Sequence, residues 1–179
     1  RIKVYNEIDN QGYLTSCNKL FTLAKGDFIT FLDADDTCLE TRLLECVKAF
    51  DTNPELSFLS TDFTRTDKLG QPISHTQTKI EYAKYAIEPN YAPIVCCATI
   101  FLRRKLLKNV GGYHPFFEKI GGEDYHWLFR LSRVGKGIHI NMPLYQYRTH
   151  EEQSHHLNSN PLKFYFAEID KEIRASIIE

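Results

Sequence analysis

The alternation of apolar and polar residues along the chain predicts short strands that take turns with amphipathic helices. Compact apolar runs predict strands, and apolar residues that recur every three or four positions predict helices. The expected strands are 2–5, 28–32, 56–64, 94–102, 138–140 and 144–147, and the expected helices are 12–24, 39–50, 81–87, 103–109, 123–135 and 161–178. This order is typical of an α/β fold with a mostly parallel sheet flanked by helices, whose ligands bind beyond the carboxyl ends of the strands.

Composition narrows the class of protein. The 179 residues fit one domain over 1–150, followed by a C-terminal loop and amphipathic helix over 151–179. Lys and Arg number 22 against 23 Asp and Glu, and this balance argues against nucleic acid as the main partner. Five cysteines, an odd number without a Cys-x-x-Cys pair, favour the reducing cytoplasm over a disulfide framework. No apolar run approaches the roughly 18 residues that span a bilayer.

An acidic cluster follows the apolar run 28–32. Asp33, Asp35 and Asp36 are three carboxylates within four residues, and they repel one another unless a cation or hydrogen-bond donors compensate. Clustered carboxylate oxygens suit a hard divalent ion such as Mg²⁺ or Mn²⁺, which in turn binds a diphosphate. The alternative is an acidic turn that caps the next helix, with Asp36 or Thr37 as the N-cap residue.

Two enzyme families share this local pattern. The run AKGDFITFLDADD over 24–36 resembles the Asp-x-Asp region of family 2 glycosyltransferases, which have the Rossmann-like nucleotide-diphospho-sugar transferase (GT-A) fold, a three-layer sandwich. The resemblance implies that Asp33 and Asp35 contact the donor, and that Asp33, Asp35 and Asp36 supply metal ligands. Asp33-x-Asp35-x-Thr37 also matches the first motif of haloacid dehalogenase-like phosphatases, with Ser60 or Thr61 in the second motif. That alternative is disfavoured, because no later apolar strand ends in an acidic pair.

A second acidic pair opens the helix expected over 123–135. The run GGEDYHWLFRLSRVGKG resembles the Glu-Asp motif of the same glycosyltransferases. The resemblance implies that Asp124 is the general base for the acceptor hydroxyl, that Glu123 orients neighbouring groups, and that Arg130 pairs with Glu123 or with the glycine loop. Without the resemblance, both acids could merely stabilise a helix N-terminus. Trp127 is expected in the core rather than as a platform for a sugar.

The run PLYQYRTHEEQSHH over 143–156 resembles the Tyr-Arg-x-His segment beside the donor phosphates in that family. The resemblance implies that Arg148 binds the diphosphate, for which a guanidinium offers two parallel hydrogen bonds. His150 is expected as a metal ligand or a phosphate contact. The alternatives are a solvated loop and a zinc site that includes His155 and His156, although their spacing fits no standard zinc pattern.

The chain departs from the family pattern at two places. Where the family reads Ala-Arg-Asn-x-Gly, this chain has Ser-Cys-Asn-Lys-Leu over 16–20, so that only Asn18 keeps its expected donor contact. The family also begins with two βα units, roughly 60 residues at roughly 30 per unit, which this sequence does not include. We therefore expect an exposed sheet edge, which favours homo-oligomers or a shielded edge.

Together these patterns predict a metal-dependent, inverting glycosyltransferase. The donor is expected to be a nucleotide sugar, with UDP favoured, and the acceptor a glycan or a lipid-linked hydroxyl. The expected location is the cytoplasm, including the inner face of the membrane. Residues 151–179 could form a membrane-peripheral or dimerising helix, but Lys163, Asp170 and Lys171 are typical of a solvated face. The phosphatase and a truncated domain that binds glycans or partners without turnover remain as alternatives.

Overall fold

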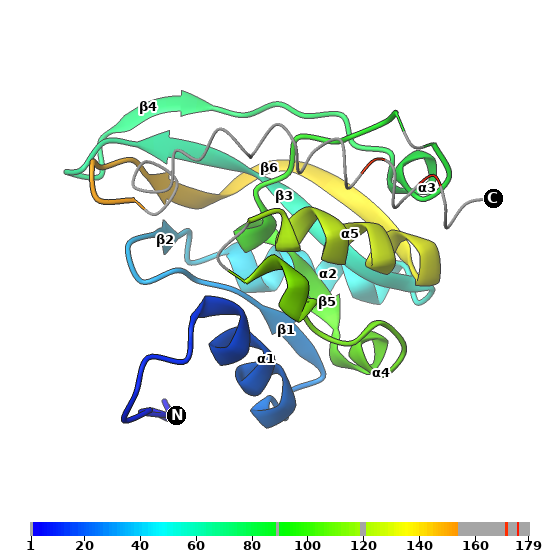
Figure 1. Ribbon diagram of the computed structural model, residues 1–179. Coiled ribbons are helices and arrows are strands. Elements are labelled where there is room, and N and C mark those ends of the chain that lie inside the picture. The colour runs from blue at the N-terminus through cyan, green and yellow to red at the C-terminus, as the bar shows by residue number, and fades with distance from the viewer. Residues whose placement is uncertain (1, 89, 119–120, 154–170, 172–174, 176–179) are drawn as a thin grey trace.

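The computed structural model describes residues 2–88, 90–118, 121–153, 171 and 175 (Figure 1). The helix expected over 161–178 falls, apart from two residues, outside this range, and so do His155 and His156. Among the helices in the described part of the chain, none is both long and apolar enough to cross a membrane.

One mixed sheet forms the centre of the fold. Its order is β1-β5-β3-β6-β2, with β4 added beside β3. The strands are β1 (Phe28–Thr30), β2 (Thr37–Cys38), β3 (Leu56–Thr66), β4 (Pro72–His75), β5 (Phe101–Arg103) and β6 (Lys136–Arg148). Among the described strands only β3 and β6 pair in parallel, so the expected α/β class is confirmed but the expectation of a mostly parallel sheet is wrong. Antiparallel neighbours need no long crossover helix, and among the described residues between β3 and β5 the one α-helix is the four-residue α3.

Helices cover both faces of this sheet. They are α1 (Tyr13–Leu23), α2 (Arg42–Thr52), α3 (Tyr82–Tyr85), α4 (Leu107–Val110) and α5 (Glu123–Val134), with 3₁₀ turns η1 (Cys97–Thr99), η2 (Arg104–Leu106) and η3 (Pro115–Phe117). Figure 1 shows α5 in front of the sheet and α2 behind it. Phe58 packs with Trp127 of α5, whereas its neighbour Leu59 packs with Phe50 of α2. Successive residues of β3 thus fill opposite cores, because side chains alternate across a strand.

The long pair β3 and β6 differs from the prediction in one instructive respect. Two strands were expected over 138–140 and 144–147, but β6 is continuous. Its register with β3 jumps from Thr61 opposite Ile140 to Asp62 opposite Pro143. This bulge absorbs the polar residues that interrupt the apolar pattern, so the sequence appeared to contain a break where the strand only bends.

Three other element predictions need correction. Residues 2–5 form no strand, and the side chain of Ile2 is 92% exposed. The strand expected over 94–102 is reduced to β5, preceded by η1. Helix α2 starts at Arg42 rather than at residue 39, because the Leu39 amide donates to Leu144 O of β6 and continues the sheet contact of β2. Strand β1 forms one end of the sheet, and association of chains through that edge stays a prediction.

Candidate functional site

The acidic loop between β1 and β2 is anchored by one of its own carboxylates. Asp36 is buried, and it accepts hydrogen bonds from Tyr145 Oη at 2.7 Å and from the Arg148 amide at 2.8 Å. Both donors belong to β6, so Asp36 connects the loop to the strand that pairs with β2. Asp36 therefore acts as a structural anchor of the loop, and its expected role as a metal ligand stays a prediction. The capping alternative is wrong, since the N-cap residue of α2 is Thr41.

Asp35 and His150 form a more open pair. Asp35 Oδ2 lies 3.0 Å from His150 Nε2, and their side chains are 43% and 25% exposed. The chain turns back at the end of β6 and so brings His150 to the acidic loop, as the resemblance implied. This carboxylate and this imidazole are the accessible donor atoms of the cluster.

Asp33 is the third carboxylate of the loop, and its environment disfavours a negative charge. Burial raises the pKa of Asp33 above its ordinary value, and the carboxylates of Asp36 and Asp35 raise it further. The guanidinium of Arg42 acts in the opposite direction and lowers the pKa of Asp33. A bound cation would relieve the same repulsion.

Arg42, which the sequence analysis did not identify, stabilises the segment that leads into the acidic loop. It is 1% exposed and donates to Phe31 O, Ala98 O and Thr30 Oγ1 at 2.7 to 2.8 Å. Its guanidinium also lies 4.9 Å from the ring centroid of Tyr145. The helical pattern put residue 42 on the polar face of its helix. The available signal was that Arg42 is the first cation after the three carboxylates, six residues beyond Asp36.

The arrangement of these donors decides which residues fit a divalent ion. Within the described part of the chain, no three His, Cys, Asp or Glu side chains converge closely enough to form a complete metal site. Asp35 and His150 fit an ion as oxygen and nitrogen donors, and Asp33 faces the adjoining pocket. Two or three protein ligands suffice for Mg²⁺ or Mn²⁺ where diphosphate oxygens and water complete the shell.

The second acidic pair, Glu123 and Asp124 at the start of α5, lies at the same pocket as the acidic loop. Asp33, Glu123 and Asp124 all line one pocket of about 440 Å³. Its other lining residues are mostly apolar or aromatic: Tyr13, Phe31, Phe63, Arg65, Ile94, Val95, Cys96, Cys97, Ala98, Tyr113 and Tyr147. A concave, largely apolar site with a few polar groups is typical of a small-molecule pocket. The structure thus brings together carboxylates from the loop after β1 and from α5 that lie far apart in the sequence.

Asp124 has restricted access to water, which disfavours its charged form. Burial raises the pKa of Asp124, while hydrogen bonds from the Tyr125 amide and the Cys97 thiol act against this rise. Gly121 and Gly122 precede the pair with φ of 87° and 92°, a left-handed conformation that favours glycine. The two glycines thereby let α5 begin with both acids directed at the pocket. A raised pKa makes a carboxylate a better proton acceptor near neutral pH.

The Gly111-Gly112 turn after α4 is held by two side chains, Asn18 and Arg130, for which the sequence analysis gave other expectations. Asn18 donates to Tyr113 O at 2.8 Å and accepts from the Tyr113 amide at 2.7 Å. Both ends of its amide are thus engaged, which gives no support to the expected donor contact. Arg130 donates to Val110 O and Gly112 O, so it pairs with the end of α4 and the Gly111-Gly112 turn, whereas the expected partners were Glu123 or the glycine loop directly before it. Trp127 is fully buried, as expected for a core residue.

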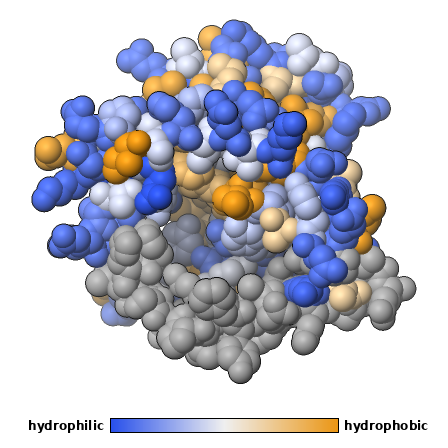
Figure 2. Space-filling model, turned by 90° about the horizontal axis from the view of Figure 1, so that it is seen from above, coloured by the Kyte–Doolittle hydropathy of each residue, from blue (hydrophilic) through white to orange (hydrophobic). Residues whose placement is uncertain are grey.

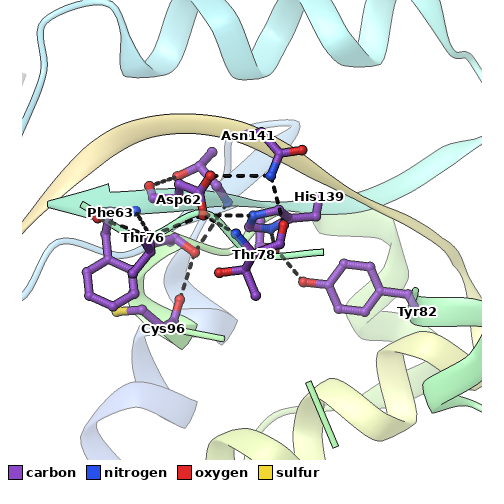
Figure 3. A network of polar contacts seen from close by, with 11 residues as sticks. Asp62, Phe63, Thr76, Thr78, Tyr82, Cys96, His139 and Asn141 are labelled. Carbon is purple, nitrogen blue, oxygen red and sulfur yellow. Dashed lines mark hydrogen bonds and ion pairs between the residues drawn. The ribbon is translucent and has the colours of Figure 1, made fainter. Parts of the chain in front are cut away.

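The phosphatase alternative needs Ser60 or Thr61 as an accessible catalytic group. Ser60 instead belongs to a buried polar network (Figure 3). Ser60 is inaccessible to solvent, and its hydroxyl contacts His139 Nδ1 at 2.7 Å and the hydroxyl of Tyr82. The carboxylate of Asp62 lies 3.2 Å from His139 Nε2 and accepts from the Thr78 amide at 3.1 Å. This network joins β3, β6 and the segment before α3. Its role is to hold the sheet and that segment together, away from the pocket.

His126, which follows the acidic pair on α5, should make stability depend on pH. It is 8% exposed, and burial lowers its pKa to about 4, with Arg130 and His114 adding to the effect. Because its folded-state pKa lies below the unfolded value, the unfolded chain takes up the proton first. Stability is therefore lost as the pH falls from about 6.5 to about 4. From pH 7 to pH 5 we expect His126 to account for a loss of about 2 kcal/mol.

Urea unfolding of wild type and His126→Gln at the two pH values measures this loss. The variant should lose about 2 kcal/mol less than the wild type between pH 7 and pH 5. His75→Gln, which removes an exposed histidine, serves as the matched control. Equal pH dependence in the wild type and His126→Gln would contradict the assignment.

The chain is similar in sequence to a known family of enzymes and to characterised relatives. Residues 1–111 match the sequence model of Glycosyl transferase family 2. The chain is 30% identical over 155 residues to the O-antigen biosynthesis protein RfbC of Myxococcus xanthus. It is 28% identical over 134 residues to the UDP-Glc:alpha-D-GlcNAc-diphosphoundecaprenol beta-1,3-glucosyltransferase WfaP of Escherichia coli. These alignments cover 83% and 74% of the chain but 11% and 50% of the two relatives, so the chain spans at most half of their length.

Solved structures share the fold. TarS 1–349 of S. aureus in complex with UDP-GlcNAc has a TM-score of 0.64 at 19% identity, over 91% of this chain and 46% of that one. Mannosyltransferase PcManGT from Pyrobaculum calidifontis, in complex with GDP-Man and Mn²⁺, has a TM-score of 0.61 at 17% identity, over 94% and 45%. The expected nucleotide-diphospho-sugar transferase fold is thereby confirmed.

Proposed function

Because the chain belongs to glycosyl transferase family 2, we propose that it supplies the metal-binding loop and the general base of an inverting glycosyltransferase. The donor is a UDP-sugar, and the acceptor is a hydroxyl of a glycan or of a lipid-linked sugar. The observation that carries the proposal is the convergence of Asp33 and the Glu123-Asp124 pair on one pocket. The UDP-Glc in the name of WfaP, and the UDP-GlcNAc and UDP in complexes of TarS, support the choice of donor.

In this proposal the acidic loop handles the leaving group. Asp35 and His150, with Asp33 beside them, would hold Mg²⁺ or Mn²⁺, which supplies positive charge to the departing diphosphate. The Mn²⁺ bound to PcManGT supports this choice of ion. Arg148 lies next to this loop through its amide contact with Asp36, and its guanidinium would bind a diphosphate oxygen. Asp36 keeps the loop in place.

The acceptor is activated from the other wall of the pocket. Asp124 takes the proton of the acceptor hydroxyl while the oxygen forms a bond to the anomeric carbon and the bond to the diphosphate breaks. Because the attacking oxygen and the leaving group lie on opposite faces of the sugar ring, the anomeric configuration inverts. Glu123 lines the same wall and orients the acceptor. The reaction belongs in the cytoplasm, where nucleotide sugars are the donors for glycans assembled at the inner face of the membrane.

Calorimetric titration of UDP with and without Mn²⁺ tests the donor site. Mn²⁺ should tighten UDP binding, and Asp35→Ala should weaken the Mn²⁺-dependent binding by about 10-fold or more, as expected for the loss of a charge-assisted contact. Asp51→Ala, which removes an exposed carboxylate at the end of α2, is the matched control. UDP binding that depends on neither Mn²⁺ nor Asp35 would contradict the proposed metal site.

A further inference from the structure

The described arginines divide into two groups according to what their guanidinium groups bind. Five of them donate side-chain hydrogen bonds to backbone carbonyls and stabilise the fold: Arg42, Arg103, Arg104, Arg130 and Arg133. Arg65 and Arg148 make no such bond within the part of the chain that the structure describes. Both stand at the ends of the paired strands β3 and β6, beside the pocket. Arginines without a structural partner next to a pocket are candidates for ligand binding.

Arg65 differs from Arg148 in its position relative to the acidic loop. Strand β2, which continues that loop, pairs with β6, and β3 lies beyond β6 in the sheet. Arg65 therefore stands on a strand that does not pair with β2, whereas Arg148 stands on the strand that does. It nevertheless lines the same pocket as Asp124, and it is the single cation among the lining residues. A role for Arg65 should accordingly be sought on the acceptor side of the pocket.

The surroundings of Arg65 indicate what kind of group would bind there. It stands opposite Tyr147 in the sheet register, and the rings of Phe63 and Tyr147 meet edge to face at 6.0 Å. The rest of the pocket carries the negative charges of Asp33, Glu123 and Asp124, which repel an anion. An anionic group in this pocket is thus stabilised only at the Arg65 wall, with a sugar ring against the neighbouring aromatic side chains. Figure 2 shows the largely hydrophilic, hollowed face of the molecule seen from above.

We infer that Arg65 binds an anionic group, a phosphate or a carboxylate, of the acceptor whose hydroxyl faces Asp124. The inference rests on the proposed transferase function and adds the substrate class. Acceptors are acidic saccharides or sugar phosphates, and neutral saccharides bind more weakly. A guanidinium suits either anion, because its planar fork forms two parallel hydrogen bonds with two oxygens.

Matched saccharide pairs test this substrate class. Wild type and Arg65→Gln, each saturated with UDP and Mn²⁺, are titrated by NMR with methyl β-D-glucuronide against methyl β-D-glucoside. A second pair compares N-acetylglucosamine 1-phosphate with N-acetylglucosamine. In the wild type, one charged probe should bind about 10-fold more tightly than its neutral counterpart. The pair that shows the preference identifies the anion as a carboxylate or a phosphate.

Three variants separate the role of Arg65 from general charge effects. Arg65→Gln should abolish the preference, and Arg65→Lys should retain part of it. Lys68→Gln removes an exposed cation from the turn after β3, outside the pocket, and should leave the preference unchanged. Equal binding of charged and neutral probes by the wild type, or a preference that survives Arg65→Gln, would overturn the inference. Weaker UDP binding in Arg65→Gln would also overturn it, by assigning Arg65 to the donor. The proposed function itself is tested separately: it fails if UDP binding depends on neither Mn²⁺ nor Asp35.

Discussion

Replacing Asp124 by Asn should lower kcat for sugar transfer by about 10²- to 10⁴-fold, the usual contribution of a general base. The amide of Asn has nearly the shape of the carboxylate but cannot accept the proton of the acceptor hydroxyl. Asp124 lines the pocket at the first turn of α5, where Gly121 and Gly122 set its direction. Because the proposed site for UDP and the metal is on the other wall, the affinity for UDP should change little. Release of UDP from the donor, with the acceptor that the wild type uses, measures the rate.

The pH profile provides a second readout of the same residue. Since burial raises the pKa of Asp124, the wild-type rate should fall on the acid side at a higher pH than an ordinary carboxyl group would cause. This acid limb should be absent from the residual activity of Asp124→Asn. Asp51→Asn, on the surface of α2, is the control for removal of one carboxylate. Full activity in Asp124→Asn would refute the base assignment. A wild type that binds UDP but never turns over would favour the alternative of a binding domain.

Replacing Arg42 by Ala should lower the free energy of unfolding by about 3 to 5 kcal/mol, the range seen when one member of a buried charged contact is removed. The substitution leaves Phe31 O and Ala98 O without their donor and opens space under Tyr145. An unsatisfied buried carbonyl costs about 1 to 3 kcal/mol, so two of them account for most of the loss. Urea unfolding followed by circular dichroism measures it.

Two variants check that this loss comes from the buried guanidinium. Arg42→Lys keeps the charge but cannot reach three acceptors, so it should lie between Ala and the wild type. Arg104→Ala removes a partly buried arginine whose bond to Gly26 O is exposed to solvent, and should cost less than about 1 kcal/mol. Because Arg42 also lowers the pKa of Asp33, its removal should raise that pKa further. A loss of stability in Arg42→Ala no larger than in Arg104→Ala would contradict the role assigned to Arg42.

Elements with strong local signals were predictable from the sequence. The apolar run before Asp33 forms β1, and the glycine pair before Glu123 sets the start of α5. In both cases neighbouring residues decide the conformation, through strand burial or through a left-handed glycine. The family resemblance placed the two acidic motifs, and the structure brings residues from both motifs to one pocket.

The sequence by itself thus determined the local elements, the glycosyltransferase family and the acidic motifs that mark the pocket. Tertiary structure alone decided what each polar side chain contacts. Asp36 turns inward because Tyr145 and the Arg148 amide are brought beside it by β6. Asn18 is engaged by the backbone of Tyr113, and Arg65 faces the pocket because β3 bends beside β6. Each contact joins residues that are distant in the sequence, and the spacing of residues along the chain carries no information about which of them will meet.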